Sequence, residues 1–170
     1  MVHQLKMGDP LCEDTKLAAL IDEGEAIRVQ DWVNDAIDNG AKLLCGNERS
    51  NNRLTPVVLT QVPEHCKIYQ EEVFGPVTIV TPYSNLDRAI EIVNSFDYGL
   101  QAGIFTANIA KAMIAFESID VGGLIVNDVP TFRVDNFPYG GVKKSGFGRE
   151  GLKYAMEELS ELKTMVIPLG

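Results

Sequence analysis

Apolar side chains recur every three or four positions along residues 22–39, and they predict one amphipathic helix. The members of this apolar face are Ala26, Val29, Trp32, Val33, Ala36 and Ile37. Gly40 follows at the position where a left-handed residue ends many helices. Ser84 and Asp87 have the spacing of a capping box, which predicts a second helix that runs to about residue 95. Two further helices are expected over residues 108–118 and 152–159.

Short apolar runs alternate with these helices and predict strands. They are KLLC (42–45), PVVL (56–59), VTIVTPY (77–83), AGIFT (102–106), VGGLIVN (121–127) and LKTMVI (162–167). The polar stretch GNERSNN (46–52) is expected to be a loop, and YGLQ (98–101) a turn. Strands that alternate with helices favour an α/β fold with a mostly parallel open sheet and flanking helices.

One connection is unusually long. Residues 128–141 contain two prolines and no helical or strand pattern, and loops of this length are often functional. The loop carries five apolar side chains, which are Val129, Phe132, Val134, Phe137 and Tyr139. A floppy surface loop would not be so apolar, so we expect these side chains to pack against the rest of the fold.

The composition narrows the class of protein. The chain has 170 residues, 45% of them hydrophobic, which is typical of a soluble globular domain. No apolar run is long enough to span a bilayer, and the first ten residues lack the apolar core of a signal peptide. The net charge of −9 disfavours nucleic acid as a partner. We therefore expect a cytoplasmic protein, with neither nucleic acid nor membrane as a partner.

The cysteines do not form a recognisable motif. Cys12, Cys45 and Cys66 include no C-x-x-C pair, and their odd number disfavours a secreted disulfide framework. His3 and His65 do not give the spacing of a zinc site, so no metal is expected. His65 adjoins Cys66, but neighbours on an extended chain point to opposite faces. We interpret all three cysteines as packing or surface residues.

The run GFGREG (146–151) matches the dinucleotide-binding pattern G-x-G-x-x-G. A Rossmann fingerprint needs a strand before it, and a helix and a second strand after it. GGVKKS precedes the run, and the 19 residues that follow it are too few for that unit. We therefore interpret residues 146–151 as a glycine-rich connection with positive φ angles and close packing.

Several segments resemble the C-terminal third of the aldehyde dehydrogenase superfamily. The strongest are EEVFGPV (71–77) and PYGGVKKSGFGREG (138–151), and QLKMGDP, GAKLLCG, TPVVL, YGLQAGIFT, VGGLIVND and ELKTMVI follow the family's order. TFRVDNFPYGG (131–141) is most similar to the branch of lactaldehyde and non-phosphorylating glyceraldehyde-3-phosphate dehydrogenases. The resemblance implies that residues 1–155 are the C-terminal portion of a catalytic domain and that residues 156–170 are an oligomerisation segment.

The same resemblance implies what the chain lacks. Members of the family bind NAD or NADP in an upstream Rossmann-like domain and oxidise aldehydes to carboxylic acids through a nucleophilic cysteine and a base glutamate. The nucleophile's segment, F-x-x-x-G-Q-x-C, does not occur here, and none of the three cysteines matches it. No catalytic residue is assigned, and we expect the isolated chain to be inactive and not to bind the cofactor.

Five residues inherit binding roles by resemblance. Glu72 matches the glutamate that accepts hydrogen bonds from the nicotinamide ribose, and Phe74 matches the aromatic residue that limits the movement of the nicotinamide. Phe132, Arg133 and Tyr139 match the loop at the mouth of the substrate tunnel. Since a guanidinium can grip a carboxylate or a phosphate, Arg133 suggests an anionic aldehyde. The alternative is an ordinary surface arginine paired with Asp135.

The tail has an implied role in assembly. The strand expected at residues 162–167 matches one that joins a sheet shared between subunits, which implies a homo-oligomer. Arg149 and Glu161 match charged positions that brace the cofactor and dimer regions, although solvated surface charges would fit equally well. Two other functions stay open: a non-catalytic α/β module that self-associates, and a nucleotide-binding protein built around residues 146–151. The sequence leaves the aldehyde and the choice of NAD or NADP undecided.

Overall fold

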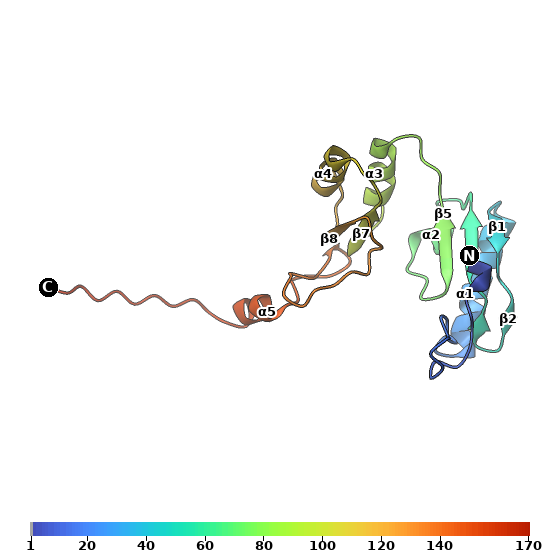
Figure 1. Ribbon diagram of the computed structural model, residues 1–170, viewed down its shortest axis with the longest axis horizontal. Coiled ribbons are helices and arrows are strands. Elements are labelled where there is room, and N and C mark those ends of the chain that lie inside the picture. Colours follow the sequence, from blue (N-terminus) through green and yellow to red (C-terminus); the bar gives the residue numbers. More distant parts are fainter. Residues whose placement is uncertain (1) are drawn as a thin grey trace. The chain divides into compact units, whose positions relative to one another are not determined.

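The computed structural model describes residues 2–170, so Met1 and the side chain of His3, both covered by the predictions above, lie outside the described residues. The chain divides into two compact units, Met1–Pro82 and Tyr83–Gly170. Each unit combines helices with short strands (Figure 1). The proposed division after residue 155 falls inside the last helix and stays a prediction.

The first unit is built on a three-stranded sheet. Its elements are η1 (Val2–Gln4), α1 (Glu23–Asp38), β1 (Lys42–Cys45), β2 (Arg49–Ser50), β3 (Arg53–Leu54), β4 (Val57–Thr60), α2 (Lys67–Gln70) and β5 (Val77–Val80). The sheet order is β1-β4-β5, with β1 antiparallel and β5 parallel to the central β4. The short strands β2 and β3 form a hairpin within and just after the stretch predicted as a loop.

Helix α1 forms as its apolar spacing predicts, and it builds the core of this unit. The Asp22 carboxylate caps its first turn by accepting the Glu25 backbone N–H at 2.8 Å, and Gly40 follows its end with a φ of 105°. Its buried face meets residues from β3, β4 and the α2 region. The core cluster is Val29, Val33, Ala36, Ala41, Leu54, Val57, Leu59, Val62, Cys66 and Ile68.

The second unit is built around a β-α-β crossover. Its elements are α3 (Leu86–Asn94), β6 (Tyr98–Gly99), β7 (Gln101–Ile104), α4 (Ile109–Ser118), β8 (Gly123–Val126), β9 (Val142–Lys143) and α5 (Leu152–Glu158). Strands β7 and β8 are parallel and are joined through α4, while β6 and β9 pair antiparallel. The α/β class predicted from the alternating pattern is therefore confirmed.

Two local predictions were wrong. The cap of α3 is Asn85, not Ser84, because the extended backbone of Asn85 lets its side chain accept the Arg88 backbone N–H at 2.9 Å. The stretch predicted as a turn contains strand β6, because Tyr98 pairs with Lys143 more than forty residues later. Neither outcome could be read from local spacing.

The strand predicted at residues 162–167 does not form in the described chain. Residues 160–170 have no helix or strand (Figure 1). Their side chains are exposed. A strand exists only where a neighbour accepts and donates its backbone hydrogen bonds, and no described residue pairs with this segment. Among residues 2–170, no helix combines the length and the apolar character that a bilayer crossing requires.

Candidate functional site

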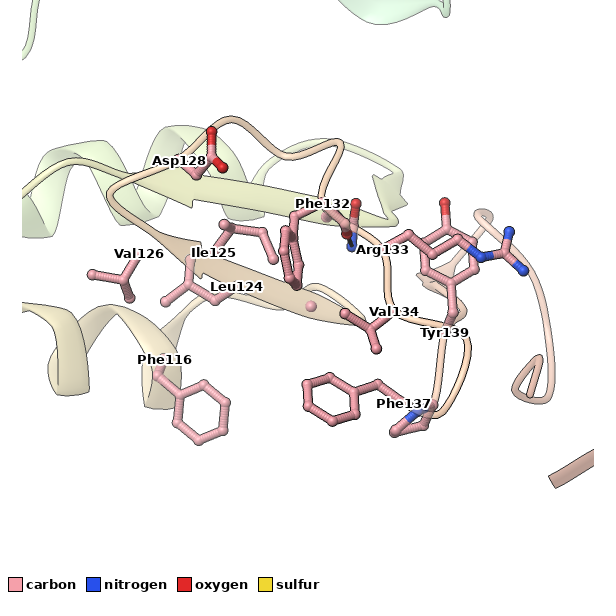
Figure 2. Close-up of a pocket in the computed structure, with 13 residues that line it drawn as sticks. Phe116, Leu124, Ile125, Val126, Asp128, Phe132, Arg133, Val134, Phe137 and Tyr139 are labelled. Carbon is pink, nitrogen blue, oxygen red and sulfur yellow. Dashed lines mark hydrogen bonds between the residues drawn. The ribbon is translucent and has the colours of Figure 1, made fainter. Parts of the chain in front are cut away.

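The long loop after β8 encloses a cavity in the second unit. Its volume is about 510 Å³. The lining comes from β8, from Phe116 of α4 and from the loop (Figure 2). Gln101 of β7 also lines the cavity. The lining residues are Gln101, Phe116, Gly123, Leu124, Ile125, Val126, Asp128, Phe132, Arg133, Val134, Phe137, Pro138 and Tyr139.

The structure brings together all three predicted substrate residues. Phe132, Arg133 and Tyr139 line the same cavity, and Figure 2 shows them on one stretch of the loop. Val129, Phe132 and Phe137 are 50%, 49% and 62% exposed, so the expectation that the apolar loop side chains pack against the fold was wrong for these three. All of the five except Val129 line the cavity. The loop's apolar character therefore reflects a lined pocket more than tight packing.

Hydrogen bonds hold the loop in place along its length. The Gln101 side chain donates to the Phe132 carbonyl at 3.1 Å, which ties the middle of the loop to strand β7. At the start of the loop, the Asn127 backbone N–H donates to the Ile104 carbonyl at 2.7 Å. These contacts make the cavity wall a defined surface instead of a free loop.

Arg133 is held by two neighbours. Its Nη2 atom donates to Glu150 Oε2 at 2.8 Å, and its guanidinium carbon lies 4.6 Å from the centre of the Tyr139 ring. Asp135, the partner expected from the sequence, is farther away, with its Oδ1 atom 4.0 Å from Nε. Glu150 is therefore the principal partner, which sequence reasoning missed because it stands seventeen positions along the chain.

The run GFGREG supplies that partner and also fixes Tyr139. Residues 139 and 150 form an antiparallel bridge in which each backbone N–H donates to the other's carbonyl, at 3.2 and 2.6 Å. Gly146, Gly148 and Gly151 all have positive φ angles. The run follows the two-residue strand β9 and precedes α5, with no strand after α5 in the described chain. The interpretation as a glycine-rich connection is confirmed.

Arg149 braces the end of the loop. Its Nη1 atom donates to the Gly141 carbonyl at 2.9 Å and to its neighbour's carbonyl, and its backbone N–H donates to Glu158 of α5. Glu161, the other charged residue singled out by resemblance, is exposed in the segment after α5. The role of either residue toward a cofactor or a subunit stays a prediction.

The predicted cofactor residues belong to the first unit. Glu72 and Phe74 lie between α2 and β5, on either side of Val73, which packs against the core. Both side chains are exposed, and Phe74 is 76% accessible to solvent. The backbone of Phe74 is left-handed, with a φ of 50°, which is rare for a residue with a bulky side chain.

The chemistry of this pair fits a nicotinamide riboside. A carboxylate offers acceptors for both hydroxyl groups of a ribose, and an exposed aromatic ring offers a flat apolar face to another ring. The pair reaches solvent because Val73, between them, turns inward to the core. The residues present therefore fit the group that the sequence resemblance implied.

The cysteines behave as packing or surface residues. All three are free, with Cys12 exposed and Cys66 buried in the core of the first unit. Burial raises the pKa of the Cys66 thiol, and the nearby Asp35 carboxylate raises this pKa further. The His65 ring contacts Asn39, with its Nε2 atom 3.4 Å from Asn39 Oδ1, rather than the thiol of Cys66.

Comparison with known proteins gives a consistent assignment. Residues 1–165 match the model of the aldehyde dehydrogenase family. A 3-sulfolactaldehyde dehydrogenase from Priestia aryabhattai is 46% identical over 167 residues, 98% of this chain and 35% of its own length. A lactaldehyde dehydrogenase from Methanococcus aeolicus is 40% identical over 166 residues, 98% of this chain and 36% of its own length.

A solved structure agrees with these relatives. The glyceraldehyde-3-phosphate dehydrogenase GapN from Methanocaldococcus jannaschii, complexed with NADP, superposes with a TM-score of 0.91 at 42% identity. The match covers 98% of this chain and 36% of GapN. The chain spans about a third of the length of the proteins it matches. Since the family model covers nearly every residue, the chain belongs to the aldehyde dehydrogenase family.

Proposed function

We propose that this chain is the C-terminal part of an NAD(P)-dependent aldehyde dehydrogenase that oxidises a small aldehyde to a carboxylic acid. The observation that carries the proposal is the cavity of the second unit, where Phe132, Arg133 and Tyr139 line one wall. These residues are the ones that the family resemblance assigned to the substrate tunnel. The three relatives, each named for an aldehyde substrate, support the same reaction.

Two residues of the first unit would hold the cofactor. The Glu72 carboxylate accepts hydrogen bonds from the hydroxyls of the nicotinamide ribose, and the Phe74 ring restricts the nicotinamide to one region. NAD or NADP supplies the acceptor for the hydride that leaves the aldehyde carbon. Support comes from the exposure of both side chains and from the NADP complex of the GapN relative.

The substrate would be a small aldehyde that bears an anionic group. Arg133 bonds Glu150 through one terminal nitrogen, and a guanidinium has five N–H donors, so donors remain for a second anion. The stacking on Tyr139 limits where those donors point. Relatives named for sulfolactaldehyde and for glyceraldehyde-3-phosphate, both anionic aldehydes, support this choice.

Replacing Arg133→Ala in the complete enzyme tests this choice. We expect kcat/KM to fall roughly 10- to 150-fold for an aldehyde bearing a carboxylate, because a charge-assisted hydrogen bond contributes about 1.5–3 kcal/mol. For the matched aldehyde with a methyl group instead of the carboxylate, the change is expected to stay within about threefold. Arg88→Ala is the control, since Arg88 pairs with Glu91 on α3 and does not line the cavity. Equal losses for both aldehydes would contradict the anionic substrate.

We propose that the 170 residues by themselves do not oxidise aldehydes, since the sequence contains no segment that matches the family's nucleophile. Incubation with an aldehyde and NAD or NADP, followed by the near-ultraviolet absorbance of the reduced nicotinamide, tests this point. Turnover by the isolated chain would contradict it and would also exclude the non-catalytic module. Tight dinucleotide binding without turnover would favour the nucleotide-binding alternative.

Self-association is a further part of the proposal. The oligomerisation segment, residues 156–170, would add the strand predicted at 162–167 to a sheet of another copy and so form a homo-oligomer. The exposed, unpaired segment after α5 supports this, because an extended apolar segment can gain backbone hydrogen bonds from a sheet edge. The cytoplasmic location expected from the sequence stays a prediction.

A further inference from the structure

The backbone at Phe74 is strained, and something must hold it. A left-handed φ of 50° places the Cβ atom of a residue other than glycine close to its own carbonyl oxygen, so such a residue persists only where its surroundings impose it. Phe74 is also 76% exposed, so burial of its own ring does not stabilise this conformation. The cause must lie in the residues on either side.

Helix α1 grips the residue before Phe74. Arg28 Nη2 donates to the Val73 carbonyl at 2.8 Å, a long-range hydrogen bond that is partly buried. The same guanidinium is fixed by Glu25, whose Oε2 atom accepts from Nε at 2.9 Å and from Nη2 at 2.7 Å. It also lies 4.5 Å from the centre of the Trp32 ring. A side chain held from three directions is a rigid donor.

The same helix packs against the residue after Phe74. A Cβ atom added to Gly75 would stand 3.0 Å from both γ-methyl groups of Val29, so the backbone approaches α1 as closely as a glycine allows. Val29 is fully buried and belongs to the core. Arg28 and Val29, consecutive residues of α1, therefore hold Val73 and Gly75. The side chain of Phe74 between them is exposed to solvent.

We propose that Arg28 is a positioning residue for the cofactor: it holds the Val73 carbonyl so that Glu72 and Phe74 are presented together to the nicotinamide riboside. The inference rests on the proposed function, since it takes these two side chains as the cofactor contacts. Arg28 would act through Val73, since its contacts are with Glu25, Trp32 and the Val73 carbonyl. Its contribution is preorganisation, because a segment already held in its binding conformation loses less entropy when the ligand binds.

The test compares three variants of the complete enzyme with the parent. Arg28→Met removes the donors and keeps an unbranched side chain over Trp32, while Arg28→Lys restores one donor and the charge. Arg88→Met is the matched control. Like Arg28, Arg88 forms an ion pair with a glutamate three positions away on its own helix, and its Nη1 atom lies 3.0 Å from Glu91 Oε2. Unlike Arg28, it forms no hydrogen bond with the described residues of segment 71–77. Dissociation constants for NAD and NADP are measured by calorimetry without any aldehyde, so the readout does not depend on turnover.

We expect Arg28→Met to raise the dissociation constant of the preferred dinucleotide about 5- to 20-fold. Arg28→Lys should recover part of that loss in affinity. Arg88→Met should change the dissociation constant less than about twofold. Amide hydrogen exchange in the free enzyme gives a second readout, with faster exchange expected in the peptide 71–77 of Arg28→Met alone. Unchanged affinity and unchanged exchange in Arg28→Met would overturn the proposal.

General destabilisation needs its own control. Val33→Ala opens a cavity under the same helix without removing a bond to Val73. If Val33→Ala weakens dinucleotide binding as much as Arg28→Met does, loss of stability explains the effect and the positioning role is wrong. If the parent enzyme binds neither NAD nor NADP, the proposed function fails and the positioning role fails with it.

Discussion

Arg133 shows how much of a residue's character is set by its neighbours. Its guanidinium forms an ion pair with Glu150 and lies over the Tyr139 ring, so its remaining N–H donors have defined directions at the wall of the cavity. The backbones of Tyr139 and Glu150 form an antiparallel bridge, so a shift of either residue would also move the guanidinium of Arg133. Cys66 shows the opposite case, in which surroundings suppress reactivity.

The first prediction concerns Cys66. Since the thiolate is the reactive form, and burial raises the pKa of this thiol, iodoacetamide at neutral pH should alkylate Cys66 at least about tenfold more slowly than exposed Cys12. Mass spectrometry of the alkylated peptides gives both rates. Unfolding the chain in urea is the control and should make the two rates similar. Equal rates in the folded chain would show that Cys66 is not protected.

At the scale of elements, the long loop of residues 128–141 depends on one close approach between backbones. Gly122 immediately precedes strand β8, and a Cβ atom there would overlap the carbonyl oxygen of Gly140. The end of the loop at Gly140 therefore lies against the residue before β8 only because Gly122 has no side chain. Its neighbour Gly123 is less constrained, since an added Cβ atom would make ordinary contact with the Gln101 side chain at 3.5 Å.

This difference gives the second prediction. Gly122→Ala should lower the free energy of unfolding by about 3 kcal/mol, because the rigid backbone of the loop must move. Gly123→Ala is the matched control and should change this free energy by less than about 1 kcal/mol, since a flexible side chain can yield. Urea denaturation followed by circular dichroism measures both. Similar losses in the two variants would mean that the close approach does not control the loop.

At the scale of the whole molecule, the segment after α5 is exposed along its length. Residues 160–170 have no strand partner in the described chain, yet they are rich in apolar side chains. The exposed apolar residues from the end of α5 onward are Leu159, Leu162, Met165, Val166, Ile167 and Leu169. A segment of this composition is best stabilised by pairing with another sheet.

The third prediction therefore concerns assembly. A complete enzyme that ends at residue 159 should have the mass of a single protomer in analytical ultracentrifugation, whereas the intact enzyme should sediment as an oligomer. Circular dichroism checks that the shortened chain is folded. An unchanged sedimentation coefficient would contradict the role assigned to residues 156–170.

Much of the fold and part of the site were predictable because they depend on neighbours in the sequence. Helix α1 follows from its apolar spacing and from Gly40 after its end, and β7, α4 and β8 follow from alternating apolar runs. The cap of α3 is Asn85 rather than the predicted Ser84. Both side chains can accept the capping hydrogen bond, and only the backbone conformation decides which one does.

The sequence by itself determined the α/β class and, by resemblance, the family and the residues that carry its motifs, since helical periodicity and motif spelling are local properties. Only the tertiary structure decided which of those residues act together. It joined Arg133 to Glu150 rather than Asp135, and Arg28 to Val73 across 45 positions, and it left residues 162–167 unpaired. The physical reason is that hydrogen bonds and ion pairs form between groups that folding brings within about 3 Å, whatever their separation along the chain.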